Sequence, residues 1–155
     1  MDEHERRTLE HIERFGCSVM HVMEDGDEPP FAYSVGITRS SAAPEVLVIG
    51  LRRELAHAMV NHYNQRVRAG ERFVVGRRYS GFLDGFDVEV AQVDASYYRA
   101  YVGWDLWLYK GPSFEVLQLV YPDTRGTWPW QPEAAAGFKA FQPLLDPQLR
   151  ARHAH

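Results

Sequence analysis

The chain has 155 residues, a formal net charge of -4 and a single cysteine, Cys17. This length favours one domain with a sizeable core, which we expect to span residues 1–155 with a frayed tail from about residue 150. The charge argues against general nucleic-acid binding, and one cysteine excludes an internal disulfide. No apolar run approaches the roughly 20 residues of a membrane span, and no signal-like segment opens the chain, so we expect a cytoplasmic protein that does not bind membranes.

The first half of the chain predicts one helix and three strands. Asp2 can cap a helix that Gly16 ends, with Leu9, Ile12 and Phe15 as its buried stripe. An Asp-Gly pair predicts a hairpin between the first two strands, and a continuous apolar run predicts a buried third strand. Met23, at the end of the first strand, is a candidate inward residue. The expected ranges are a helix at 2–15, strands at 17–23, 31–37 and 45–50, and a loop at 39–44.

The second half begins with the clearest helix, at 52–69, where apolar residues recur at helical spacing. A strand with alternating character follows at 86–93, with Val88 and Val90 facing inward and Asp87 and Glu89 facing outward. Its predicted hairpin partner lies at 73–79, joined to it by a turn at 80–85. The remaining expected elements are a short helix at 95–102, a strand at 114–121 and a short helix at 133–141.

Hairpins dominate this order of elements, and regular alternation of strands and helices is absent. Such an order is typical of the α+β class. We therefore expect an antiparallel sheet or a small split barrel with two or three helices packed outside it.

The segment 118–132 is the strongest candidate for a functional loop. It leaves a strand through a turn that holds Asp123 and Arg125, and continues through Trp128 and Trp130, each followed closely by a proline. Prolines make this exit extended and stiff. In one interpretation Arg125 pairs with Asp123 and the indoles close the end of the sheet. In the other, the loop walls a pocket in which indoles pack on a planar ligand and Arg125 meets its charge.

Two other clusters have a structural and a functional interpretation. Six of the thirteen residues at 97–109 are aromatic, which is typical of core packing but also of ring-lined pockets. Five arginines lie at 66–78, among them Arg77 and Arg78. They form either a solvated face or an anion site, since guanidinium groups suit phosphate and carboxylate.

Several chemistries lack their motifs. The sequence has no phosphate-binding glycine loop, no G-x-S-x-G elbow and no Cys/His group at zinc-ligand spacing. His57 and His62 are five residues apart, which does not place them side by side on a helix. We therefore expect no metal.

The motifs Pro30-Phe-Ala-Tyr-Ser-Val-Gly-Ile37, Pro44-Glu-Val-Leu-Val-Ile-Gly-Leu51, Leu117-Gln-Leu-Val-Tyr-Pro-Asp123 and Trp128-Pro-Trp-Gln-Pro132 together resemble a bacterial family. It is the domain-of-unknown-function family numbered forty-two sixty-two. The resemblance covers about residues 16–132. It implies no activity and assigns no catalytic residue.

The layout of hairpin, apolar strand and helix is also similar to flavin-reductase-like split barrels. That resemblance implies FMN as a cofactor, with hydroxyl groups and arginines around its phosphate. The residues that would match are Ser34, Thr38, Arg39 and Ser40, with Arg77 and Arg78.

Three functional classes follow. The first is a domain that binds a small flavin- or nucleotide-like molecule, as an oxidoreductase does. The second is a non-catalytic interaction module that meets a protein partner, or a second copy in a homodimer, through its aromatic cluster and Trp-Pro-Trp loop. The third is a small hydrolase or transferase that uses Asp123, Arg125 and a histidine within hydrogen-bond reach of Asp123.

Overall fold

The predicted central strand is β3 (Glu45–Ile49), and all five of its residues are buried. In the computed structural model, which describes residues 1–153, β3 pairs antiparallel with β2 (Phe31–Val35) and parallel with β6 (Val116–Val120). The sheet continues to β1 (Ser18–Val22) beyond β2, and to β5 (Phe86–Gln92) and β4 (Arg78–Leu83) beyond β6.

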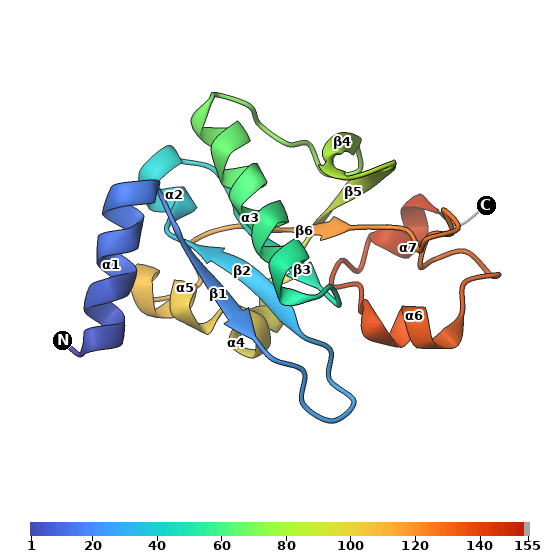
Figure 1. Cartoon of the computed structure of the whole chain (residues 1–155), viewed down its shortest axis with the longest axis horizontal. Helices are drawn as coiled ribbons and strands as arrows, with labels where there is room; N and C mark the ends of the chain where they lie inside the picture. The colour runs from blue at the N-terminus through green and yellow to red at the C-terminus, as the bar shows by residue number, and fades with distance from the viewer. Residues whose placement is uncertain (154–155) are drawn as a thin grey trace.

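The α+β class is confirmed, and the sheet within the described residues has the order β1-β2-β3-β6-β5-β4 (Figure 1). It is open rather than closed into a barrel. It is also mixed rather than wholly antiparallel, because β3 and β6 run in the same direction. The chain between these strands forms α3 (Arg53–Arg68), the β4–β5 hairpin and two shorter helices, and then returns as β6 between β3 and β5.

Helices cover both faces of the sheet (Figure 1). The largest is α3 (Arg53–Arg68), which packs on β1, β2, β3 and β4. The described helices are α1 (Glu3–Phe15), α2 (Ile37–Ser41), α3, α4 (Tyr98–Tyr101), α5 (Gly103–Tyr109), α6 (Ala136–Phe141) and α7 (Leu149–Arg152), with a 3-10 turn at Ala95–Tyr97.

Side chains that alternate along the strands build a core on each face. Val46 and Val48 of β3 face α3 and pack with Met59, Val60 and Tyr63. The intervening residues of β3 face the other way, in a second cluster made with α4, α5 and the buried Ile12 of α1. The aromatic segment 97–109 belongs mainly to this second core, which fits its packing interpretation.

The cap of α1 forms as the sequence predicts. Asp2 accepts a hydrogen bond from the Glu5 N–H at 2.8 Å, the Glu5 carboxylate accepts one from the Asp2 N–H at 3.0 Å, and Gly16 ends the helix at φ 91°. Phe15 is 49% exposed, so its assignment to the buried stripe is wrong. Met23, at 82% exposed, does not face the core either.

Four local predictions are wrong. The loop predicted at 39–44 contains the end of α2, and the second strand ends at Val35 instead of 37. The strand predicted at 73–79 begins only at Arg78 and runs through the predicted turn, so that the hairpin turns at Asp84 and Gly85. Glu89 is 2% exposed rather than facing solvent, because the chain beyond β6 covers that face of β5.

Candidate functional site

A cleft of about 540 Å³ lies at the carboxyl ends of β3 and β6, the parallel pair of the sheet. Segments from four parts of the chain meet there: the exit of β3 with the first turn of α3, the β4–β5 turn, the exit of β6, and α6. Its apolar walls are Leu51, Leu55, Leu83, Phe86, Tyr121, Pro122, Phe138 and Phe141. Clefts of this size with mainly apolar walls are typical of small-molecule sites.

The polar groups of the cleft lie at its rim. Arg52 stands at the start of α3, and no side chain caps this helix. The first N–H groups of α3 therefore have no side-chain acceptor, and the helix dipole favours an anion near them. Asp84, Asp123 and Thr124 supply acceptors and a hydroxyl group on the other side. The rim thus offers both a positive end and hydrogen-bond acceptors.

Close backbone contacts fix the shape of the cleft. Gly50 has φ 91°, and a Cβ at this position would lie 2.4 Å from the Phe141 carbonyl oxygen and 2.6 Å from the Tyr121 hydroxyl. That hydroxyl donates to the Ile49 carbonyl at 2.6 Å. The buried Gln142 side chain accepts from the Tyr121 N–H at 3.0 Å and donates to its carbonyl at 2.9 Å. These contacts join the ends of β3 and β6 to the segment that follows α6.

Asp123 lies at this cleft, and its carboxylate organises the turn after β6. Its Oδ1 accepts hydrogen bonds from the backbone N–H groups of Arg125 and Thr127, both at 2.9 Å. Arg125 thus meets Asp123 through its main chain, while its side chain is exposed. Within residues 1–153 no histidine hydrogen-bonds to Asp123, which is the contact that the hydrolase hypothesis needs.

Trp128 and Trp130 belong to a different site, where they stack with the Arg78 guanidinium and the His153 ring. Arg78 lies 4.4 Å from the Trp128 ring centroid, the two indoles are 5.0 Å apart at 10°, and the His153 ring lies 3.9 Å from Trp130 at 6°. Cations prefer such positions over an indole face. Each ring face covered in this way is hidden from solvent, and Trp128 is 9% exposed.

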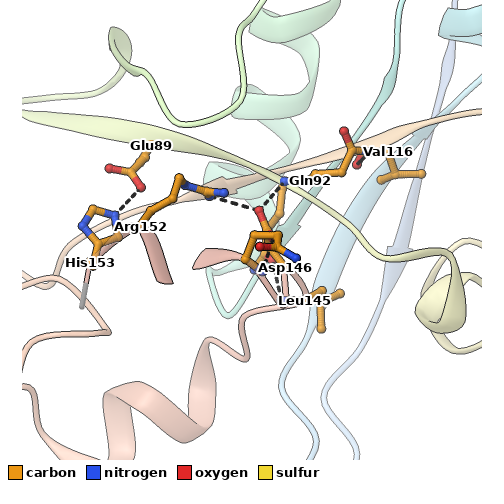
Figure 2. A network of polar contacts seen from close by, with 9 residues as sticks. Glu89, Gln92, Val116, Leu145, Asp146, Arg152 and His153 are labelled. Atoms are coloured by element: carbon orange, nitrogen blue, oxygen red, sulfur yellow. Dashed lines mark hydrogen bonds and ion pairs between the residues drawn. The ribbon is translucent and has the colours of Figure 1, made fainter. Parts of the chain in front are cut away.

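Glu89 and Asp146 tie the carboxyl-terminal segment to β5 (Figure 2). Glu89 accepts from Arg78 Nε at 3.2 Å and contacts His153 Nε2 at 2.7 Å. Asp146 accepts from the Gln92 N–H and from the Arg152 guanidinium, both at 3.0 Å. The segment expected to fray is thus packed as far as His153, and Leu149 is fully buried. Residues 154 and 155 lie outside the described residues.

Ser34, Thr38 and Arg39 gather at a third place, around the buried carboxyl group of Glu45. Ser34 Oγ donates to Glu45 at 2.8 Å, and the Thr38 N–H donates at 3.0 Å. Tyr109 also donates to Glu45, and its oxygen accepts from the Arg39 N–H at 3.1 Å. Glu45 is 0% exposed, so the hydrogen bonds that it accepts stabilise the β2–α2–β3 connection.

The phosphate site implied by the flavin-reductase resemblance is therefore not assembled as expected. Ser34 is on β2 and Arg78 is on β4, and three strands of the sheet separate them. Arg77 is exposed and pairs through its backbone, with its carbonyl accepting from the Val90 N–H at 3.0 Å. Of the nine predicted site residues, only Asp123 and its neighbour Arg125 lie at the turn beside the cleft.

Most of the cleft's own residues were missed. Gly50, Leu51 and Arg52 directly follow the strongest predicted strand, and Tyr121 and Pro122 follow the last one. Placing these two strands in one sheet was correct. Nothing in the sequence indicates that the two strands run parallel. Their parallel direction brings both carboxyl ends to one edge of the sheet, where the cleft lies.

The described residues give no sign of a metal centre or a membrane span. Among residues 1–153, no three His, Cys, Asp or Glu side chains gather where a metal ion could be held. His21 Nε2 and His57 Nδ1 do meet at 2.9 Å, and burial lowers the pKa of His21 to about 4, with Arg53 contributing. Within the same residues, no helix is long and apolar enough to cross a membrane.

Fold and cleft together define an α+β domain with an open mixed sheet and a ligand-sized hollow at its parallel pair. The family model described as "Domain of unknown function (DUF4262)" matches residues 11–135, and the chain belongs to this family. Comparisons with curated proteins and with solved structures give no match. The matched segment ends before α6, so Phe138 and Phe141 lie outside it.

Proposed function

We propose that the cleft binds a small molecule with a planar, largely apolar body and an anionic group, as flavin- and nucleotide-like ligands have. The observation that carries this proposal is the cleft of about 540 Å³ with aromatic and aliphatic walls at the ends of β3 and β6. Ligands of open sheets bind beside the carboxyl ends of parallel strands. The phenyl rings of Phe86, Phe138 and Phe141 offer faces for a planar body.

The rim supports the anionic group and a hydrogen-bonding portion of the ligand. Arg52 and the free N–H groups at the start of α3 favour a phosphate or carboxylate. Asp84 and Asp123 also line the cleft and favour hydroxyl or amino donors. A ring system that carries hydroxyl groups and a terminal phosphate combines these features. An oxidoreductase role adds the requirement that the bound molecule be redox-active, which FMN meets.

The experiment is isothermal titration calorimetry with FMN and with ADP. It is carried out on the purified wild type and on Phe141→Ala. Removal of an apolar contact of this kind weakens binding by about tenfold or more. The control is Phe15→Ala, because Phe15 is 49% exposed and Phe141 is 39% exposed but only Phe141 lines the cleft.

We expect at least one of the two ligands to bind, with weaker binding in Phe141→Ala and unchanged binding in Phe15→Ala. Equal dissociation constants in all three proteins would remove the cleft from the site. Absence of binding by both FMN and ADP would reject the flavin- or nucleotide-like class. Native mass spectrometry of the freshly purified protein then identifies any other molecule that comes with it.

The geometry gives less support to the interaction-module and hydrolase or transferase hypotheses. In the Trp-Pro-Trp loop, Arg78, His153 and the indoles cover one another's ring faces, which leaves less aromatic surface for a partner. Asp123 is occupied by two backbone N–H groups, which leaves it poorly placed as a base.

A further inference from the structure

Two buried carboxyl groups lie in the core opposite α3, away from the cleft. Glu45 is on β3, Asp105 is in the first turn of α5, and both are 0% exposed. Glu45 accepts four hydrogen bonds, from Ser34 Oγ, the Ile37 and Thr38 N–H groups and the Tyr109 hydroxyl. In contrast, within residues 1–153 neither carboxyl oxygen of Asp105 has a hydrogen-bond partner. A buried group without partners needs an explanation.

No cation balances this pair. Among the described residues, no Lys, Arg or His forms an ion pair with Glu45 or Asp105 or lowers the pKa of either group. The Gly36 amide favours the charged form of Asp105, and the opposing effect of burial is larger. The titratable groups whose pKa values the pair affects are Cys17, Tyr33, Tyr63, Tyr98 and Tyr109, with Arg68 acting on Cys17 and Arg72 on Tyr63.

Burial in this setting opposes a charge on Asp105. An ionised carboxylate taken out of water without a partner carries a large cost, and a second carboxylate nearby adds repulsion. The pKa of Asp105 is accordingly raised well above its ordinary value, first by burial and then by Glu45. Burial also raises the pKa of Glu45, against the effect of its four donors.

We propose that Asp105 is a proton-controlled latch: α5 packs against the sheet while the buried Asp105 carboxyl group is protonated and neutral, and loosens when the proton leaves and a charge would be buried. The helix has few other polar ties to the sheet. They are the Trp104 N–H, which donates to the Tyr33 hydroxyl at 3.1 Å, and the Tyr109 contact with Glu45. Release of α5 uncovers Tyr33, Val35 and Leu47 in the second core.

The direction of the effect follows from proton linkage. Docked Asp105 binds its proton more tightly than released Asp105, because its docked pKa is the higher one. Docking of α5 is therefore fully stabilised below the ordinary carboxyl pKa of about 4, and weakens as pH rises from there to the docked pKa. Within this window the equilibrium between docked and released α5 shifts by up to about tenfold per pH unit.

Hydrogen exchange followed by mass spectrometry tests this, measured from about pH 4 to about pH 9 and corrected for the intrinsic dependence of exchange on pH. In the wild type, we expect protection of residues 103–109 to fall with pH while protection of α3 stays level. In Asp105→Asn, which keeps the shape without the charge, we expect the α5 profile to be flat. The control is Glu115→Gln, which removes an exposed carboxylate near β6 and should keep the wild-type slope.

Three results would overturn the latch. The first is a flat α5 profile in the wild type. The second is an equal loss of protection in α5 and α3 as pH rises, which would indicate global destabilisation. This result can be seen in the wild type alone. The third is an unchanged slope in Asp105→Asn. Emission from Trp104 and Trp107, both on α5, provides a second readout of release in the wild type.

Discussion

The carboxylate of Asp123 accepts hydrogen bonds from two backbone N–H groups of its own turn, those of Arg125 and Thr127. One interpretation of the sequence predicts an ion pair between Asp123 and the Arg125 guanidinium. The other predicts that this guanidinium binds a ligand. The structure instead uses the Arg125 backbone. This is a common role for aspartate at a turn, where its short side chain bonds N–H groups two residues or more further along.

The first prediction compares these two neighbours. Asp123→Ala removes the acceptor of two backbone N–H groups and should lower the free energy of unfolding by about 1–2 kcal/mol. Arg125→Ala removes an exposed side chain and should change it by less than about 0.5 kcal/mol. Urea denaturation of both variants measures the difference. Equal losses would show that the Arg125 side chain contributes to the turn.

Gly50 illustrates a residue that only a three-dimensional contact explains. Its φ of 91° disfavours any side chain, and a Cβ would also meet the Phe141 carbonyl oxygen. Gly85 has a similar φ of 79° but nothing within 4 Å of its added Cβ. The two glycines share the backbone strain and differ in the contact.

The second prediction uses this pair. Gly85→Ala should cost about 1–2 kcal/mol, the strain of a left-handed conformation alone. Gly50→Ala should cost about 1–3 kcal/mol more, because α6 must move away from β3. Thermal and chemical denaturation measure both, and the proposed ligand of the cleft should bind less well only to Gly50→Ala. If both variants lose the same stability, α6 is not held closely against Gly50.

At the scale of elements, the center of the sheet depends on two strands buried on both faces. Every residue of β3 and of β6 is buried, and the two strands pair through Glu45–Val116, Val46–Leu117 and Leu47–Gln118. Opening either strand breaks ladders with both of its neighbours. Central strands of this kind open only with the whole protein.

The third prediction follows for hydrogen exchange in the native state. Amides at 46–49 and 117–120 should exchange most slowly, with protection near the global free energy of unfolding. Those of the edge strand β4, whose register is irregular between Tyr79 and Leu83, should exchange faster. Fast exchange at 46–49 would contradict the central position of β3.

The elements with strong local signals could be predicted from the sequence. Capping residues placed α1, and long apolar periodicity placed α3, β3 and β6 within a few residues. Glu89 shows the limit of such patterns. The alternation predicted for its strand was correct, but both faces of the strand are covered. Whether a face is covered depends on distant segments, in this case the loop of Trp128 and the residues near His153. The cleft was missed for the same reason, because its walls come from four separate parts of the chain.

For the whole molecule, the two cores share the same strands. Val46 and Val48 serve one face of β3, while Leu47 and Ile49 serve the other. Loss of either core therefore exposes the strands that support the other one. This coupling supports the proposal that the chain is a single cooperative domain.

The fourth prediction tests that proposal by equilibrium unfolding. Tryptophan emission and far-UV circular dichroism should give one transition with the same midpoint, as expected for a single domain of this size. The tryptophans report from two regions, Trp104 and Trp107 on α5 and Trp128 and Trp130 beyond β6. Two separated midpoints would indicate that the segment after β6 unfolds on its own.

The parallel pairing of β3 with β6 also has a consequence for synthesis on the ribosome. A nascent chain that has emerged only as far as β5 can pair β1, β2 and β3, but one edge of β3 still lacks its partner. That edge is apolar and unprotected, which makes it a site for pairing with other chains. Closing it requires a contact between distant parts of the sequence, and such contacts slow folding. The center of the sheet is thus the most protected part of the finished protein and the most aggregation-prone part of the unfinished one.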